Sequence, residues 1–196
     1  IAIQNTKPPK GQTEESVNQA VEEARKGDLT DILAIAEKSY ADAAVREGIA
    51  TLDAKLAAMA KAKVARNLGT LLIASNQSRA YTLFIEATEL GDADFFGWIE
   101  RGRLALVCGD TADMLFANRN ALVVAKQSDD NRNIAIAESA IADHAMITGN
   151  LPVSVEHFVR ANEAMQRRAF AAPNDLGKQR DLSISYMKIG DVKFAH

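Results

Sequence analysis

The sequence predicts an all-α chain built as an α-solenoid, with about four antiparallel helix hairpins and roughly eight to nine helices. Three observations carry this prediction. The 196 residues are 47% hydrophobic, 25% charged and only 6% aromatic, a composition that favours helix over sheet. Apolar residues recur at helical spacing, and no segment shows the two-residue alternation of a strand. Similar segments also return after roughly 34 residues, which is typical of stacked helix pairs.

The N-terminal part predicts a lead-in followed by a first hairpin. Residues 1–12 contain two prolines and a glycine, and we expect them to be flexible. Thr13 can cap the first helix, which should end at Gly27, and a second helix should end near Gly48. The first hairpin is therefore expected over about 13–48.

The remaining helices follow in pairs, separated by turns rich in Gly, Asn, Asp, Ser or Pro. Apolar residues from Leu52 to Ile73 predict one helix, and its partner should run from about Arg79 to Leu90. Later helices are expected near 94–108, 112–128, 131–148, 152–171 and from 179 to the end. The corresponding hairpins are about 52–91, 94–128 and 131–172, with a truncated repeat over 176–196. Residues 13–196 are thus predicted to form a single helical-repeat domain.

Small and aromatic residues recur at matching places in these hairpins. They are Leu68, Gly69, Ala80, Phe84 and Ala87 in one copy, Trp98, Gly102 and Ala121 in the next, Phe158 and Ala161 in a third, and Gly190 in the last. The pattern resembles the tetratricopeptide repeat (TPR), which has Trp-x2-Leu-Gly-x2-Tyr on one helix and Ala-x3-Phe-x2-Ala on its partner. The sequence departs from it at Arg101, where Leu is expected, at Asn118, where Phe is expected, and at Ala142, where Gly is common.

The resemblance covers roughly residues 14–196 and is closest to bacterial TPR-containing proteins. It implies a right-handed solenoid in which Gly and Ala lie where two helices touch, while an aromatic ring fills the gap to the next repeat. It also implies a non-enzymatic scaffold that binds a protein or peptide ligand in a concave groove lined by the first helix of each repeat. In this register the groove residues are Lys63, Arg66, Asn67, Thr70, Glu100, Arg103, Ser139, Asp143 and Lys188.

Two alternatives to a binding groove stay open. The chain can be a module for self-association into a homo-oligomer, or the regulatory arm of a larger protein whose catalytic domain lies elsewhere. The sequence starts without Met and stops within an apparent helix, so we expect a fragment of something longer.

Charge and hydropathy bear on the remaining partners. The net charge of −3 provides no basic surface, so we expect no nucleic acid. No apolar run approaches the ~18 residues of a membrane span, so we expect no membrane insertion in this part of the protein. The N-terminus lacks a signal pattern, and the cytoplasm is the expected compartment.

No motif points to catalysis. Cys108 is the single cysteine and has no basic neighbour in sequence, so we expect a buried structural thiol. His144 and His157 flank a turn, with Asp143 or Glu156 as further candidate ligands, but two imidazoles without an HExxH pattern are a weak metal site. Since a G-x-S-x-G elbow and a phosphate-binding glycine cluster are also missing, we predict no metal, no cofactor, no catalytic residue and no enzymatic activity.

Overall fold

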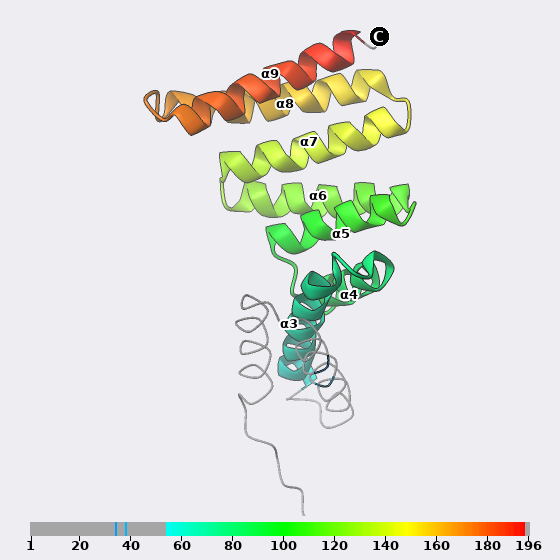
Figure 1. The fold of residues 1–196 in the computed structure, drawn as a ribbon. Coiled ribbons are helices and arrows are strands. Elements are labelled where there is room, and N and C mark those ends of the chain that lie inside the picture. The colour runs from blue at the N-terminus through cyan, green and yellow to red at the C-terminus, as the bar shows by residue number, and fades with distance from the viewer. Residues whose placement is uncertain (1–33, 35–37, 39–53, 195–196) are drawn as a thin grey trace, which may run out of the picture. The chain divides into compact units, whose positions relative to one another are not determined.

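A computed structural model describes residues 34, 38 and 54–194 of the chain (Figure 1). Ala34 and Lys38 are helical and exposed. The lead-in predicted over 1–12 and most of the hairpin predicted over 13–48 lie outside the described residues. The chain divides into two compact units, Ile1–Ala93 and Asp94–His196. The single domain over 13–196 therefore stays a prediction.

The described residues form seven helices and no strand. The helices are α3 (Ala54–Leu72), α4 (Gln77–Glu89), α5 (Phe95–Val107), α6 (Thr111–Gln127), α7 (Asn131–Ile147), α8 (Leu151–Phe170) and α9 (Leu176–Phe194). Each begins and ends within three residues of the bounds expected from the sequence. The eight to nine helices predicted for the whole chain exceed these seven because most of the first predicted hairpin lies outside the described part. Within that part, no helix is long and apolar enough to cross a membrane.

Short polar turns fix the helix ends. Asp94 and Asp110 precede α5 and α6, and their carboxylates accept the backbone N–H three residues further on. These contacts satisfy donors that the first helical turn leaves unpaired. Gly109 and Gly149 lie in the turns that precede α6 and α8. Their φ angles are +80° and +75°, in the left-handed region that favours glycine after a helix. The turn chemistry that predicted the boundaries therefore also explains them.

The start of α9 is capped by a carboxylate in the same way. The backbone N–H of Lys178 donates to the carboxylate of Asp175 at 3.1 Å and lowers the pKa of that carboxyl below its ordinary value. Because the folded-state pKa is lowered, the stabilisation is present above the pKa of the unfolded chain. It is lost as the pH falls through the lowered pKa.

The α3–α4 hairpin of the first unit packs through a glycine and an aromatic ring. A Cβ added at Gly69 would lie 3.1 Å from Cδ2 of Phe84 and 3.4 Å from the carbonyl oxygen of Ala80. Phe84 is 2% exposed, and Leu68, Ala80 and Ala87 are fully buried. The two helices approach so closely here because Gly69 has no side chain.

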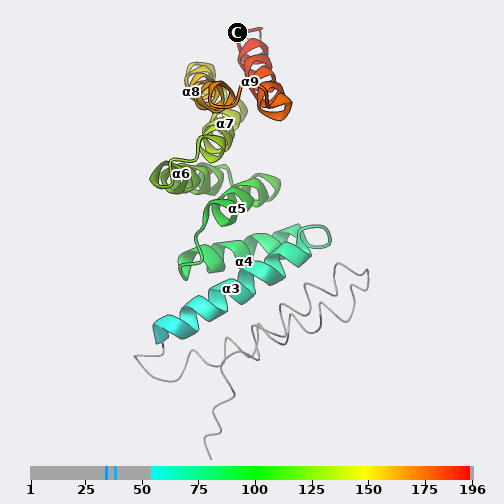
Figure 2. The same ribbon diagram turned by 90° about the vertical axis from the view of Figure 1, so that its left-hand side faces the viewer.

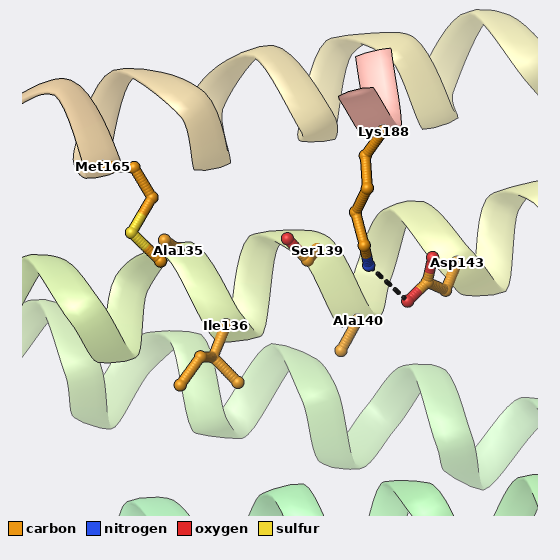
Figure 3. A pocket seen from close by; sticks show the side chains of 7 residues that line it. All are labelled: Ala135, Ile136, Ser139, Ala140, Asp143, Met165 and Lys188. Carbon is orange, nitrogen blue, oxygen red and sulfur yellow. Dashed lines mark hydrogen bonds and ion pairs between the residues drawn. The ribbon is translucent and has the colours of Figure 1, made fainter. Parts of the chain in front are cut away.

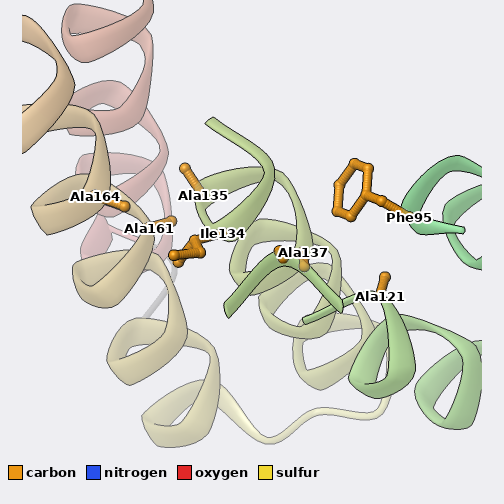
Figure 4. Packing of buried hydrophobic residues seen from close by; sticks show 8 residues of the cluster. Phe95, Ala121, Ile134, Ala135, Ala137, Ala161 and Ala164 are labelled. Atoms are coloured by element: carbon orange, nitrogen blue, oxygen red, sulfur yellow. The ribbon is translucent and has the colours of Figure 1, made fainter. Parts of the chain in front are cut away.

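In the second unit each helix packs mainly on its neighbour in sequence, and Figures 1 and 2 both show α8 and α9 side by side. A core rich in alanine runs through helices α5, α6, α7 and α8 (Figure 4). It consists of Phe95, Ala121, Ala125, Ile134, Ala135, Ala137, Ala161 and Ala164. Trp98 packs against this cluster and is partly buried. A second cluster of Ala142, Phe158 and Val192 joins α7, α8 and α9.

The two departures from the TPR signature in α5 and α6 form a buried polar arrangement. Arg101 is 6% exposed, and its guanidinium holds the carboxylate of Asp113 with contacts of 2.9 and 2.5 Å. The guanidinium also lies 5.5 Å from the ring centre of Trp98 and 5.2 Å from that of Phe116. Asn118 is buried against Gly102, where an added Cβ would collide with its side-chain oxygen. Polar side chains thus occupy places where the signature has apolar ones.

Two expectations differ from the structure. Cys108 is exposed, so the prediction of a buried thiol is wrong. It caps the C-terminal end of α5, where Leu106 and Val107 are also exposed and only the preceding Leu104 and Ala105 face the core. Gly190, expected at a helix contact, is exposed, and an added Cβ would meet nothing within 4 Å. The signature's glycine packs on the helix that follows it, and the described residues hold no helix after α9.

Candidate functional site: a pocket between α7 and α9

An open pocket of about 310 Å³ lies between α7 and α9 in the second unit (Figure 3). Its walls are Ala135, Ile136, Ser139, Ala140 and Asp143 of α7, Met165 of α8 and Lys188 of α9. The residues of α7 are one, three or four positions apart and therefore lie on one side of that helix. The lining is mainly apolar, with a hydroxyl and two charged groups among it.

The two charged groups form a loose ion pair. Nζ of Lys188 lies 3.4 Å from Oδ2 of Asp143, and the two side chains are 40% and 46% exposed. The same ammonium lies 5.1 Å from the ring centre of Phe158. An exposed pair of this kind contributes roughly 0–1 kcal/mol to stability. A polar group of a ligand can therefore replace either partner of this ion pair at little cost in free energy.

The structure brings together three of the residues predicted to line a groove, namely Ser139, Asp143 and Lys188. Glu100 and Arg103 pair with each other along α5 at 2.8 Å and do not line the pocket. The other predicted residues lie on α3 in the first unit: Lys63, Arg66, Asn67 and Thr70. A binding role for these nine residues stays a prediction.

Arg66 has a partner within its own unit. One guanidinium nitrogen lies 3.2 Å from Oδ1 of Asp92, and the carbonyl of Arg66 accepts the hydroxyl of Thr70 at 2.9 Å. Since Arg66 links α3 to the residues after α4, replacing it would disturb packing as well as any groove. It is therefore a poor probe of binding.

The apolar walls of the pocket escaped the sequence reasoning. The predicted set consisted of polar side chains on first helices, whereas the pocket also uses Ala135, Ile136 and Ala140 of α7. These three share the helical spacing of Ser139 and Asp143, so the periodicity of α7 was a signal that could have found them. Met165 comes from α8, and no spacing within one helix could have indicated it.

The histidines have a different setting from a metal site. Nδ1 of His157 lies 2.6 Å from Oε2 of Glu138, a carboxylate that is 2% exposed. Nζ of Lys126 is 3.8 Å from the other oxygen of Glu138. His144 is half-buried in the last turn of α7. Among the residues that the structure describes, no three His, Cys, Asp or Glu side chains are grouped to hold a metal ion.

Replacing His157 with Ala is expected to lower the free energy of unfolding by about 1–3 kcal/mol, because a buried carboxylate loses its closest partner. Urea denaturation followed by circular dichroism measures this loss. The matched control is Glu156→Ala, which removes an exposed pair with Arg160 on the same helix. That pair should contribute about 0.3–0.5 kcal/mol. Equal losses in the two variants would contradict a structural role for the contact between His157 and Glu138.

Comparison with known proteins identifies the fold. No protein-family model matches the sequence, and no curated protein matches it. One solved structure of the protein MamA is similar at 12% identity and a TM-score of 0.60, covering 93% of this chain and 92% of that one. A second MamA structure is similar at 16% identity and a TM-score of 0.50, covering 86% and 98%.

A thermophilic TPR protein in Thermus thermophilus is similar at 14% identity, covering 89% of this chain and 99% of that one. Its TM-score of 0.39 is too low to add weight. Three findings indicate the same helical-repeat fold. They are the helix hairpins, the close contact between Gly69 and Phe84, and the similarity to the two MamA structures. The chain therefore has the TPR-like helical-repeat fold that its sequence predicts.

Proposed function

We propose that the chain is a non-enzymatic protein–protein interaction scaffold, and that the pocket between α7 and α9 binds an apolar side chain of a peptide or protein partner. The observation that carries this proposal is the pocket itself, an apolar hollow with an exchangeable ion pair at its edge. Ligand sites typically combine apolar walls with a few polar groups that fix orientation.

The lining indicates how a peptide would sit. A volume of about 310 Å³ is at the small end of ligand pockets, which suits a side chain better than a whole cofactor. Ile136 and Met165 offer apolar contact to such a side chain. The ammonium of Lys188 can donate to a backbone carbonyl, and the carboxylate of Asp143 can accept a backbone N–H. One anchoring side chain with its flanking backbone would then contact the apolar walls and both charged groups of the lining.

Filling the pocket is expected to weaken peptide binding at least tenfold. Peptides are first selected from a random library on the full chain, and their dissociation constants are then measured for the chain and for Ser139→Trp. The indole would occupy the space of the anchoring side chain, and a tenfold change corresponds to about 1.4 kcal/mol. Val123→Trp is the matched control, because Val123 is 53% exposed on α6 and does not line the pocket.

The variant Lys188→Met separates the contribution of the charged group to peptide affinity from that of the apolar walls. It keeps most of the side-chain volume and removes the donor, so binding should weaken by a smaller factor than in Ser139→Trp. Unchanged affinities in both variants would place the peptide elsewhere. A library without any enriched peptide would count against peptide binding as the function.

A further inference from the structure

The walls of the pocket between α7 and α9 differ in the side chains that they offer to an anchoring group. On α7 they include Ala135, Ser139 and Ala140, which have short side chains. Met165 of α8 and Lys188 of α9 both reach toward α7, with Ser139 between them in the view of Figure 3. A flat group that lies on the short side chains would therefore meet the thioether of Met165 and the ammonium of Lys188.

The thioether of Met165 is held in place beside the pocket. Met165 is partly buried and packs against the alanine-rich core of the second unit. Methionine sulfur is polarisable and makes favourable contacts with aromatic rings, often at the ring edge. An aliphatic anchor would gain only the burial of apolar surface from the same side chain.

The ammonium of Lys188 lies beside an aromatic ring of the chain itself. Its Nζ is 5.1 Å from the ring centre of Phe158, which is buried in α8. A cation within about 6 Å of the centre of an aromatic ring is attracted by the ring's π electrons. Because Lys188 also lines the pocket, an aromatic ring bound there would meet the same ammonium.

The second unit holds another cation between two rings. The guanidinium of Arg101 lies 5.5 Å from the ring centre of Trp98 and 5.2 Å from that of Phe116. An aromatic anchor in the pocket would give Lys188 a similar arrangement, with Phe158 as one ring and the anchor as the other.

We propose that the anchoring side chain of the partner is aromatic, so that the pocket recognises a Phe, Tyr or Trp in a peptide segment. This inference rests on the proposed function, because it names the side chain that the pocket would take. Apolar burial alone favours any large hydrophobic residue. The thioether and the ammonium add a preference for an aromatic ring over an aliphatic group of the same size, since both interact with the π electrons of the ring.

Replacing the aromatic ring of a bound peptide tests this preference. Peptides selected on the full chain from a random library are expected to share an aromatic residue. Cyclohexylalanine at that position keeps the apolar bulk and removes the π electrons. We expect the dissociation constant, measured by fluorescence anisotropy of labelled peptides, to rise about fivefold because both favourable contacts with the ring are lost. Selected peptides that share a Leu or Ile in place of an aromatic residue would overturn the inference.

Two pairs of variants assign the preference to the two side chains. Met165→Leu keeps the apolar volume and removes the sulfur, and Met146→Leu makes the same change outside the pocket. Lys188→Gln removes the charge, with Lys178→Gln as its control outside the pocket. We expect the loss of affinity caused by cyclohexylalanine to shrink about twofold in Met165→Leu and in Lys188→Gln, and to stay about fivefold in both controls. An equal loss in all four variants would contradict the proposed contacts.

Methyl NMR locates the bound ring directly. The chain has five methionines, and the methyl resonance of Met165 is the one that disappears in Met165→Leu. The aromatic peptide should shift this resonance through the ring current, whereas the cyclohexylalanine peptide has no ring current to do so. An unchanged Met165 resonance at saturating aromatic peptide would place the ring elsewhere.

Failure of this inference and failure of the proposed function give different results. A peptide that Ser139→Trp weakens, but whose affinity does not change with cyclohexylalanine, would leave the pocket as the binding site and exclude an aromatic preference. A peptide that Ser139→Trp does not weaken would exclude the pocket itself, and the aromatic preference with it.

Discussion

Replacing Arg101 with Ala is expected to lower the free energy of unfolding of the second unit by about 3–5 kcal/mol. The substitution leaves the carboxylate of Asp113, whose side chain is only 14% exposed, without the guanidinium that holds it. It also removes the cation from the rings of Trp98 and Phe116. Loss of one member of a buried charge pair is among the few changes that destabilise a domain this strongly.

Urea denaturation followed by tryptophan fluorescence measures this effect, because Trp98 is the chain's single tryptophan and contacts Arg101. The matched control is Arg103→Ala, two positions further on the same helix, where an exposed pair with Glu100 is lost. That loss should be about 0–1 kcal/mol. The double variant Arg101→Leu/Asp113→Leu should recover much of the stability, since an apolar pair needs no charged partner. A loss in Arg101→Ala no larger than in Arg103→Ala would contradict this account.

Replacing Phe84 with Ala is expected to lower the free energy of unfolding of the first unit by about 3–5 kcal/mol. The ring is 2% exposed and covers Gly69, so its removal leaves a cavity that α3 and α4 can close only in part. Hydrogen exchange of the amides in α3 and α4 reports on this unit alone. Met59→Ala, at a position 54% exposed on α3, is the control and should change stability by less than about 0.5 kcal/mol.

A double-mutant cycle tests the cause. Gly69→Ala alone should destabilise, because its Cβ would lie 3.1 Å from the ring of Phe84. In the Phe84→Ala background the same change should stabilise by up to about 1 kcal/mol, since the space is open and Ala favours helix over Gly. A coupling energy near zero would show that the two residues do not pack against each other.

The sequence by itself determined the helices and where they end. Apolar periodicity set their extent, and Asp or Asn caps with glycine turns set their limits, because both signals act between residues close in the chain. The TPR-like fold followed from the same local repetition, as the contact of Gly69 with Phe84 illustrates. Sequence could not interpret Arg101 and Asn118, which looked like errors in a pattern.

Only the tertiary structure decided how side chains from different helices meet. Arg101 is stable in the core because Asp113, Trp98 and Phe116 converge on it, and no spacing within one helix encodes that convergence. The exposure of Cys108 likewise depends on how the end of α5 packs, since Leu106 and Val107 beside it are also exposed. The pocket needs Met165 and Lys188 from two helices beside α7. Local chemistry sets a helix and its ends, whereas a site depends on contacts between distant residues that one sequence does not reveal.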